Sequence, residues 1–229
     1  MINSDIIIEA FVDDLDYNNI DLLNGDLILD CTDNIYTRFL INDYSKKFNI
    51  PWIYASVIGA KGMTMNITKE TPCLACIFKE PTEALDTCET AGVLNTTPHA
   101  IAAIQVTEAI KIITNQEYSK DLVHYDLWHN LLTKITLKKS RKCKVCKGEY
   151  DYLLGKKVKS SIKICGSCNY QIKLNPINIE QLHKRIKEDS TLTKECLILK
   201  EVIIFKSGRA LVKAESQEKA KAIVDRYLG

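Results

Sequence analysis

The sequence contains neither of the common glycine-rich loops that hold the phosphates of a nucleotide. Its 9 glycines form no G-x-G-x-x-G and no G-x-x-x-x-G-K-[ST] pattern. Such loops bind phosphate because glycine lets backbone N–H groups approach the anion closely at the start of a helix. The usual backbone cradle for a nucleotide is therefore not expected within these 229 residues.

Long apolar segments and a secretory leader are missing too. No run approaches the roughly 18 apolar residues that a membrane-spanning helix needs. The opening MINSDIIIEAFVDD becomes acidic at once, without the basic start of a signal peptide. The composition, 46% hydrophobic and 26% charged with a net charge of +2, is that of an ordinary globular chain. We therefore expect a cytoplasmic protein without a membrane partner.

Aromatic residues are scarce in the most basic part of the chain. Residues 134–163 carry 11 Lys and Arg against Glu149 and Asp151, but only Tyr150 and Tyr152 supply aromatic rings. Segments that bind single-stranded nucleic acid combine cationic and aromatic side chains. Nucleic acid is therefore not the expected partner, and a zinc-ribbon module that binds nucleic acid through this segment is kept as a lesser alternative.

Short apolar runs alternate with helical patterns along the first part of the chain. The order strand, helix, strand predicts a right-handed crossover and a parallel pair of strands in an α/β fold. Near residue 138 the composition becomes basic and rich in cysteine, which predicts two domains, 1–138 and 139–229. We expect strands at 26–30, 50–59, 62–68 and twice within 122–137, helices at 34–48, 97–114, 178–188 and 216–228, and a hairpin at 202–212.

Six of the 9 cysteines form three C-x-x-C pairs, Cys73/Cys76, Cys143/Cys146 and Cys165/Cys168. In a cytoplasmic chain this pattern indicates metal binding rather than disulfides, and two pairs make one tetrahedral zinc site. The 18 residues between the second and third pairs fit a zinc ribbon. The first pair is then a metal knuckle, a redox motif or two buried thiols, and the pairing stays open.

Two further places carry side chains suited to chemistry. Asp30 and Asp33 follow a predicted parallel strand, at the edge where α/β sheets bind ligands, and suit Mg²⁺ or a ribose hydroxyl. The alternative is that Asp33 or Asn34 only caps the next helix. Cys88 is an unpaired cysteine in a polar stretch, and is either a nucleophile or an incidental surface thiol.

Five stretches of the sequence are informative when taken together, namely LILDCTDNIYTRFLINDYS, IPWIYASVIGAKGMTM, TPCLACIF, TCETAGVLNTTPHAIAAIQVTEAIKII and CKVC. In order and spacing they resemble the ThiF/MoeB/HesA family. The enzymes of this family use ATP and Mg²⁺ to adenylate the C-terminal glycine of ubiquitin-like sulfur-carrier proteins. The stretch TCETAGVL and the C-terminal tail are closer to ThiF, which implies thiamine thiazole synthesis. The resemblance implies a partial Rossmann-like domain with a structural zinc site and a small α+β unit at the C-terminus.

The resemblance implies a role for individual residues. Asp33 matches the family's catalytic aspartate, which acts with Mg²⁺ and the nucleotide, and Asn34 lies beside it in the same site. Cys88 matches the thiol that forms a covalent link with the activated carrier. Cys168 does not belong to the family pattern, so the resemblance disfavours the ribbon, although a second metal at the third pair stays open. The family's zinc ligands match Cys73, Cys76, Cys143 and Cys146.

The resemblance also implies partners. The family's glycine-rich loop, ribose-binding acid and phosphate-contacting cations precede the segment that matches residues 1–10. We therefore expect this chain to be a truncated product, one part of a split enzyme with a separate N-terminal nucleotide-binding fragment, or an inactive carrier-binding remnant. The other expected partners are the sulfur-carrier protein and a second copy of the chain in a homodimer.

Overall fold

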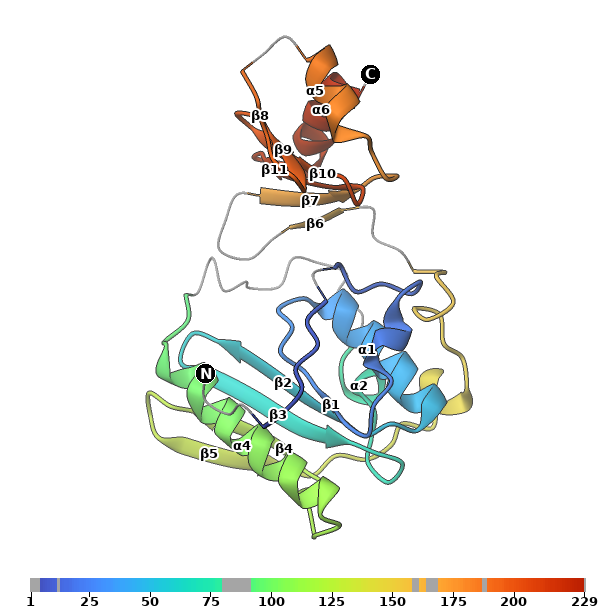
Figure 1. Ribbon diagram of the computed structural model, residues 1–229. Helices are drawn as coiled ribbons and strands as arrows, with labels where there is room; N and C mark the ends of the chain where they lie inside the picture. Colours follow the sequence, from blue (N-terminus) through green and yellow to red (C-terminus); the bar gives the residue numbers. More distant parts are fainter. Residues whose placement is uncertain are drawn as a thin grey trace. The chain divides into compact units, whose positions relative to one another are not determined.

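The computed structural model describes residues 5–11, 13–79, 92–157, 161–163, 169–186 and 189–228. Contacts divide the chain into two compact units, one of residues 1–56, 62–80 and 99–157, the other of residues 57–61, 81–98 and 158–229. Each unit has its own sheet (Figure 1). Among the described residues, no helix has the length and apolar character needed to span a membrane.

The first sheet has five strands in the order β1-β2-β3-β4-β5. Strand β1 runs parallel to β2, with Ile28 opposite Trp52, and helix α1 connects the two, as the sequence predicted. Strands β4 and β5 form the predicted antiparallel hairpin. The bounds are β1 Ile28–Leu29, α1 Ile35–Phe48, β2 Trp52–Ile58, β3 Lys61–Ile67, β4 Leu122–Asp126 and β5 Leu131–Ile135, with a short helix η1 at Ile20–Leu23.

Different helices pack on the two faces of this sheet. Trp52 and Met65 belong to the same buried cluster as Leu40 of α1, so α1 covers one face. Alternate strand residues point to the opposite face, where helix α4 (Thr96–Ile113) packs and the side chain of Ile101 lies against Gly62. The result is an α/β arrangement in which the carboxyl end of β1 lies between two helices.

A buried carboxylate fastens α4 to the sheet. The Glu108 side chain, 10% exposed, accepts hydrogen bonds from Asn66 Nδ2 at 2.6 Å, the Ser119 backbone N–H at 2.7 Å and Lys111 Nζ at 2.6 Å. Burial raises the pKa of Glu108, but the hydrogen bonds lower it by more than burial raises it. The pKa of Glu108 therefore lies below its usual value. The folded state therefore favours the ionised form of Glu108.

Replacing Glu108 by alanine is expected to lower the free energy of unfolding by about 1–3 kcal/mol, because the Ser119 N–H loses its acceptor in a half-buried position. Since the folded-state pKa is lowered, this stabilisation is present above the unfolded-state pKa and is lost as the pH falls through the folded-state value. Urea unfolding at pH 7 and pH 4 measures both effects. The matched control is Glu70→Ala, which removes only an exposed ion pair with Lys120. Equal effects of the two variants would contradict the assigned role of Glu108.

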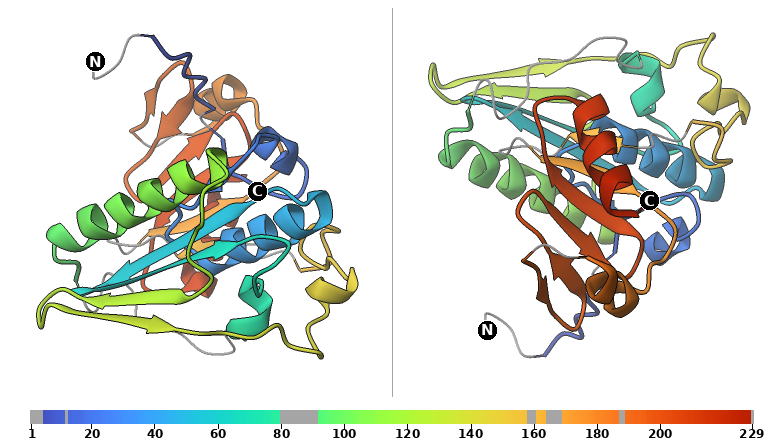
Figure 2. Two further views of the ribbon diagram at one scale, coloured as in Figure 1. Left: turned by 90° about the horizontal axis from the view of Figure 1, so that it is seen from below. Right: turned by 90° about the horizontal axis from the view of Figure 1, so that it is seen from above.

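The second sheet is antiparallel, with six strands in the order β6-β7-β11-β10-β9-β8. Helix α6 lies along one face of it (Figure 2), where Val224 packs among Val202, Ile204 and Val212. The predicted hairpin turns at Gly208, whose φ of 85° favours glycine. The bounds are β6 Ser161–Lys163, β7 Asn169–Lys173, α5 Ile179–Arg185, β8 Thr191–Leu192, β9 Cys196–Ile198, β10 Val202–Phe205, β11 Arg209–Lys213 and α6 Gln217–Leu228.

Candidate metal centre and the loop after strand β1

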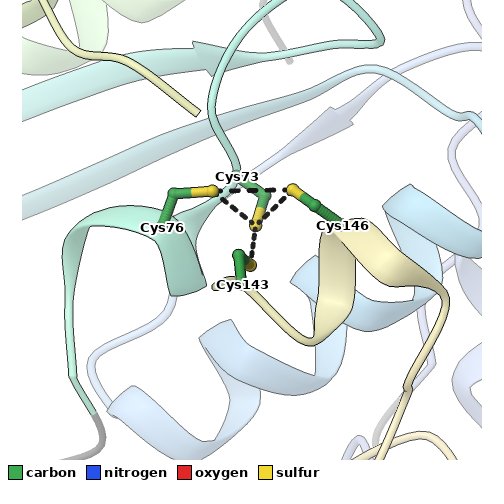
Figure 3. Close-up of side chains that lie close together, drawn as sticks. All are labelled: Cys73, Cys76, Cys143 and Cys146. Atoms are coloured by element: carbon green, nitrogen blue, oxygen red, sulfur yellow. Dashed lines mark hydrogen bonds between the residues drawn. The ribbon is translucent and has the colours of Figure 1, made fainter. Parts of the chain in front are cut away.

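Four cysteine sulfurs converge in the first unit (Figure 3). The Sγ of Cys73 lies 3.5 Å from that of Cys143, 3.5 Å from that of Cys146 and 3.7 Å from that of Cys76, and all four sulfurs lie within 4.8 Å of one another. A zinc ion bound tetrahedrally at about 2.3 Å from each thiolate places its sulfurs about 3.8 Å apart. The donor set and its spacing therefore fit zinc.

Packing against helix α1 brings the pair Cys73/Cys76 close to the pair Cys143/Cys146. Cys73 precedes the short helix α2 (Leu74–Ile77), whose first N–H, from Leu74, is bound 2.8 Å from Asn42 Oδ1 of α1. Cys143 of the second pair precedes the 3-10 helix η2 (Val145–Lys147) and Cys146 lies within it, and Val145 is buried in the same core cluster as Cys73. Both pairs are thus fixed by packing against α1, not by each other alone.

Electrostatics favour a cation among the four sulfurs. The Cys73 thiol donates to the sulfur of Cys76, which raises the pKa of Cys73 and lowers the pKa of Cys76 to about 4. Burial raises the pKa of Cys146 to about 11. Several thiolates this close repel one another unless a cation balances their charge. The backbone N–H of Ser140 also donates to Cys76 at 3.4 Å, in the manner of a residue that orients a metal ligand.

Asp30 directly follows strand β1, and its carboxylate is buried within the loop of residues 30–34. Its Oδ1 accepts hydrogen bonds from the Thr32 backbone N–H at 2.8 Å and the Thr32 hydroxyl at 2.7 Å. Its Oδ2 forms an ion pair with Arg38 Nε at 3.0 Å, and the Asp30 side chain is fully buried. Asp30 is therefore committed to the protein interior, and a role for it in binding Mg²⁺ or ribose is disfavoured.

Asp33 and Asn34 take different positions in the same loop. Asn34 caps α1, with its Oδ1 accepting the Thr37 N–H at 2.8 Å, so the helix cap that the sequence left open between Asp33 and Asn34 belongs to Asn34. Asp33 is exposed at the carboxyl end of β1. Its carboxylate is thus placed where α/β sheets bind ligands, while the cap already occupies the Asn34 side-chain oxygen.

Sequence reasoning missed Arg38 and Gln105, which both contact this loop. Arg38 pairs with Asp30 from α1, and Gln105 Nε2 donates from α4 to the carbonyl oxygens of Asp30 at 3.0 Å and Ile53 at 2.9 Å. A buried aspartate needs a cationic partner, but the sequence does not show which cation of a neighbouring element reaches it. Cys88, Cys165 and Cys168 lie outside the described residues.

The structure thus has an α/β domain in which the exposed Asp33 follows strand β1 and four cysteines converge around α2 and η2. The model of the ThiF family matches residues 1–146, and the chain belongs to this family. It is 28% identical to the "Sulfur carrier protein ThiS adenylyltransferase" of Bacillus subtilis (strain 168), over 100% of this chain and 73% of that protein. The relative with the same description in Escherichia coli (strain K12) is 33% identical over 54% of this chain and 51% of its own length.

Two other proteins show how far the similarity extends. The "SAMP-activating enzyme E1" of Haloferax volcanii is 28% identical over 63% of this chain and 56% of its own length. A crystal structure of E. coli MccB aligns with 59% of this chain and 43% of that chain at a TM-score of 0.50 and 15% identity, which shows a common fold alone. The chain thus spans about half of most of these proteins and 73% of the Bacillus relative.

Proposed function

We propose that this chain serves as a ThiF-type adenylyltransferase that activates the C-terminal glycine of a ubiquitin-like sulfur-carrier protein with ATP. The observation that carries the proposal is the similarity to the Bacillus adenylyltransferase, which extends over 100% of this chain and so includes the second unit as well as the family domain. Because that relative is named for the carrier ThiS, we assign the activity to thiamine thiazole synthesis.

A structural zinc ion is part of the proposal. Cys73, Cys76, Cys143 and Cys146 would hold it as four thiolates, and the fit of the sulfur spacing to a tetrahedral ion supports this assignment. The zinc would tie the chain around α2 to the segment around η2, some 70 positions later. All four positions of a tetrahedral ion are then filled by protein, so its role is structural and not catalytic.

Asp33 and Asn34 supply only part of what a nucleotide-binding site needs. Asp33 would bind Mg²⁺ and so neutralise charge near the phosphates, with Asn34 beside it. The sequence offers no glycine-rich phosphate cradle. The second part of the proposal is therefore that a separate nucleotide-binding fragment supplies the cradle and joins this chain in the active enzyme.

Pyrophosphate release tests this function. The chain is incubated with Mg²⁺, ATP and ThiS from Bacillus subtilis, once alone and once with the part of the Bacillus adenylyltransferase that this chain does not match. Carrier-dependent release with the added fragment is the expected result. No release in either mixture, while the carrier still binds the chain in a pull-down, would show that the protein is an inactive carrier-binding remnant.

Replacing Cys88 by alanine separates the two chemical steps. We propose that the Cys88 thiolate attacks the acyl carbon of the adenylated carrier and forms a thioester as AMP leaves. Cys88→Ala is therefore expected to abolish this thiol-sensitive adduct on a non-reducing gel and to leave pyrophosphate release unchanged. Cys196→Ser, in strand β9 of the second unit, is the control and should keep the adduct. An adduct that persists in Cys88→Ala would exclude this cysteine.

Three lesser expectations stay predictions: the cytoplasmic location, the homodimer and the domain boundary at residue 138. The zinc-ribbon module for nucleic acid is disfavoured, since Cys143 and Cys146 lie with the first cysteine pair. Its distinguishing property would be an affinity for nucleic acid that falls steeply with salt.

A further inference from the structure

We propose that Arg38 is a positioning residue, which holds the loop of residues 30–34 in the conformation that presents the Asp33 carboxylate to Mg²⁺. The inference rests on the proposed function, because Asp33 acts only if the chain takes part in adenylation. Its evidence is separate and lies in the contacts between Arg38 and the backbone around Asp33.

Arg38 binds three acceptors on two segments, the loop of residues 30–34 and strand β2. Its Nε pairs with Asp30 Oδ2 at 3.0 Å, and its Nη2 donates to the carbonyl oxygens of Thr32 at 2.5 Å and Ala55 at 2.9 Å. The Thr32 carbonyl belongs to the rigid peptide plane that also contains the backbone nitrogen of Asp33. By holding this carbonyl, the guanidinium fixes the peptide from which Asp33 projects.

Hydrogen bonds hold the rest of the loop in place and leave Asp33 exposed to solvent. Thr32 donates its backbone N–H and its hydroxyl to Asp30, so both sides of the Thr32 residue are bound. Asp30 is buried, Thr32 is half-buried, and Cys31 and Asp33 between and after them are exposed. Arg38 neutralises the buried carboxylate, which leaves Asp33 as the exposed acid of the loop.

The hydrogen bond from Arg38 to the Ala55 carbonyl oxygen fixes the loop relative to strand β2. Ala55 belongs to β2, so Arg38 joins the loop to the neighbouring strand at the carboxyl edge of the sheet. Gln105 acts from the opposite helix, where it joins the carbonyl oxygens of Asp30 and Ile53. A side chain that must bind a metal in one geometry requires this kind of support, because small displacements of a ligand cost affinity.

Removing one partner of a buried ion pair destabilises the fold, so the variants must separate an effect on stability from an effect on the position of Asp33. Arg38→Lys keeps the positive charge beside Asp30 but lacks the planar fork that reaches several acceptors. The double variant Asp30→Asn with Arg38→Gln removes both charges together, which avoids an unpaired buried carboxylate. Arg226→Gln is the control, since Arg226 pairs with Glu201 on the exposed surface of the second unit.

The first measurement is amide hydrogen exchange by NMR, which does not depend on activity. In Arg38→Lys and in the double variant, the Thr32 amide is expected to exchange at least about tenfold faster, because its protection depends on the fixed loop. Amides of β10 and β11 should keep the wild-type rate and so report an intact fold. Wild-type protection at Thr32 in the double variant overturns the proposal.

The second measurement is the Mg²⁺ dependence of pyrophosphate release in the two-fragment mixture. The Mg²⁺ concentration for half-maximal rate is expected to rise about 10- to 100-fold in both Arg38 variants, as for other residues that orient metal ligands. Adding Asp33→Asn to the double variant should then have less effect than in wild type, because the two residues act on one step. A wild-type Mg²⁺ dependence in the double variant overturns the inference, whereas absence of release from wild type overturns the proposed function and leaves the exchange result to decide on Arg38.

Discussion

Cys73→Ser is expected to remove the bound zinc and to lower the free energy of unfolding by on the order of 4 kcal/mol or more, the range reached when a protein loses a structural metal. The Cys73 side chain is fully buried, and its sulfur lies 3.5–3.7 Å from the other three. Serine is a poor ligand for zinc and would leave a hydroxyl among apolar neighbours. Zinc content by mass spectrometry and thermal unfolding measure the two effects.

The effect of Cys73→Ser extends beyond the metal because of where the cluster lies. Cys73, Leu74, Cys143 and Val145 belong to the buried cluster that also contains residues of α1. Loss of the ion would remove the link between the segments around α2 and η2 and would loosen the packing of both segments on α1. A strong zinc chelator added to the wild-type protein should lower the melting temperature in the same direction, and serine at Cys143 should match serine at Cys73.

Two controls decide between the possible pairings of the cysteines. Cys196→Ser replaces a half-buried cysteine of the second unit, and Cys168→Ser replaces one member of the third pair. Both variants are expected to keep one zinc per chain. The opposite pattern, with zinc lost in Cys168→Ser and kept in Cys73→Ser, would restore the ribbon that spacing favoured.

The cysteine pairing shows where sequence spacing stops being informative. The 18-residue interval between Cys146 and Cys165 satisfies a general rule for ribbons, whereas the two pairs that converge are separated by about seventy positions. Their approach depends on how α2 and η2 pack against α1, which is a tertiary property. The family resemblance supplied the grouping that spacing did not.

Local signals predicted α1, α4, α6 and the hairpin of β10 and β11, because the causes of these elements are local, whereas strands β6 to β9 were not predicted. Asn34 precedes an amphipathic stretch and caps α1, and Gly208 permits the positive φ of the hairpin turn. Arg38 was missed for the opposite reason. Its position inside α1 looks like that of any exposed basic residue, and only the crossover that brings α1 beside β1 and β2 reveals its three acceptors. Residues that support a site from neighbouring elements are therefore the hardest to find in one sequence.

Asp33→Asn is expected to lower the rate of pyrophosphate release about 100- to 1,000-fold, the loss seen when one electrostatic group is removed from a reacting centre. Asparagine has nearly the same shape as aspartate, and Asp33 is exposed, so the loop and the melting temperature should not change. What is lost is the negative charge that we propose holds Mg²⁺. Rate and melting temperature, measured on the same preparation, distinguish this effect from that of a residue that supports the fold.

The matched control for this variant is Asp26→Asn. Asp26 is also exposed, but it lies before the amino end of β1, whereas Asp33 follows the carboxyl end. A change of net charge alone affects both variants equally, while the proposed site depends on the carboxyl end, where α/β sheets bind their ligands. A large loss in Asp33→Asn with wild-type release in Asp26→Asn would assign the chemistry to that edge. Equal rates in the two variants would show that Asp33 does not hold the metal, and the Mg²⁺ ligand would then have to come from the nucleotide-binding fragment.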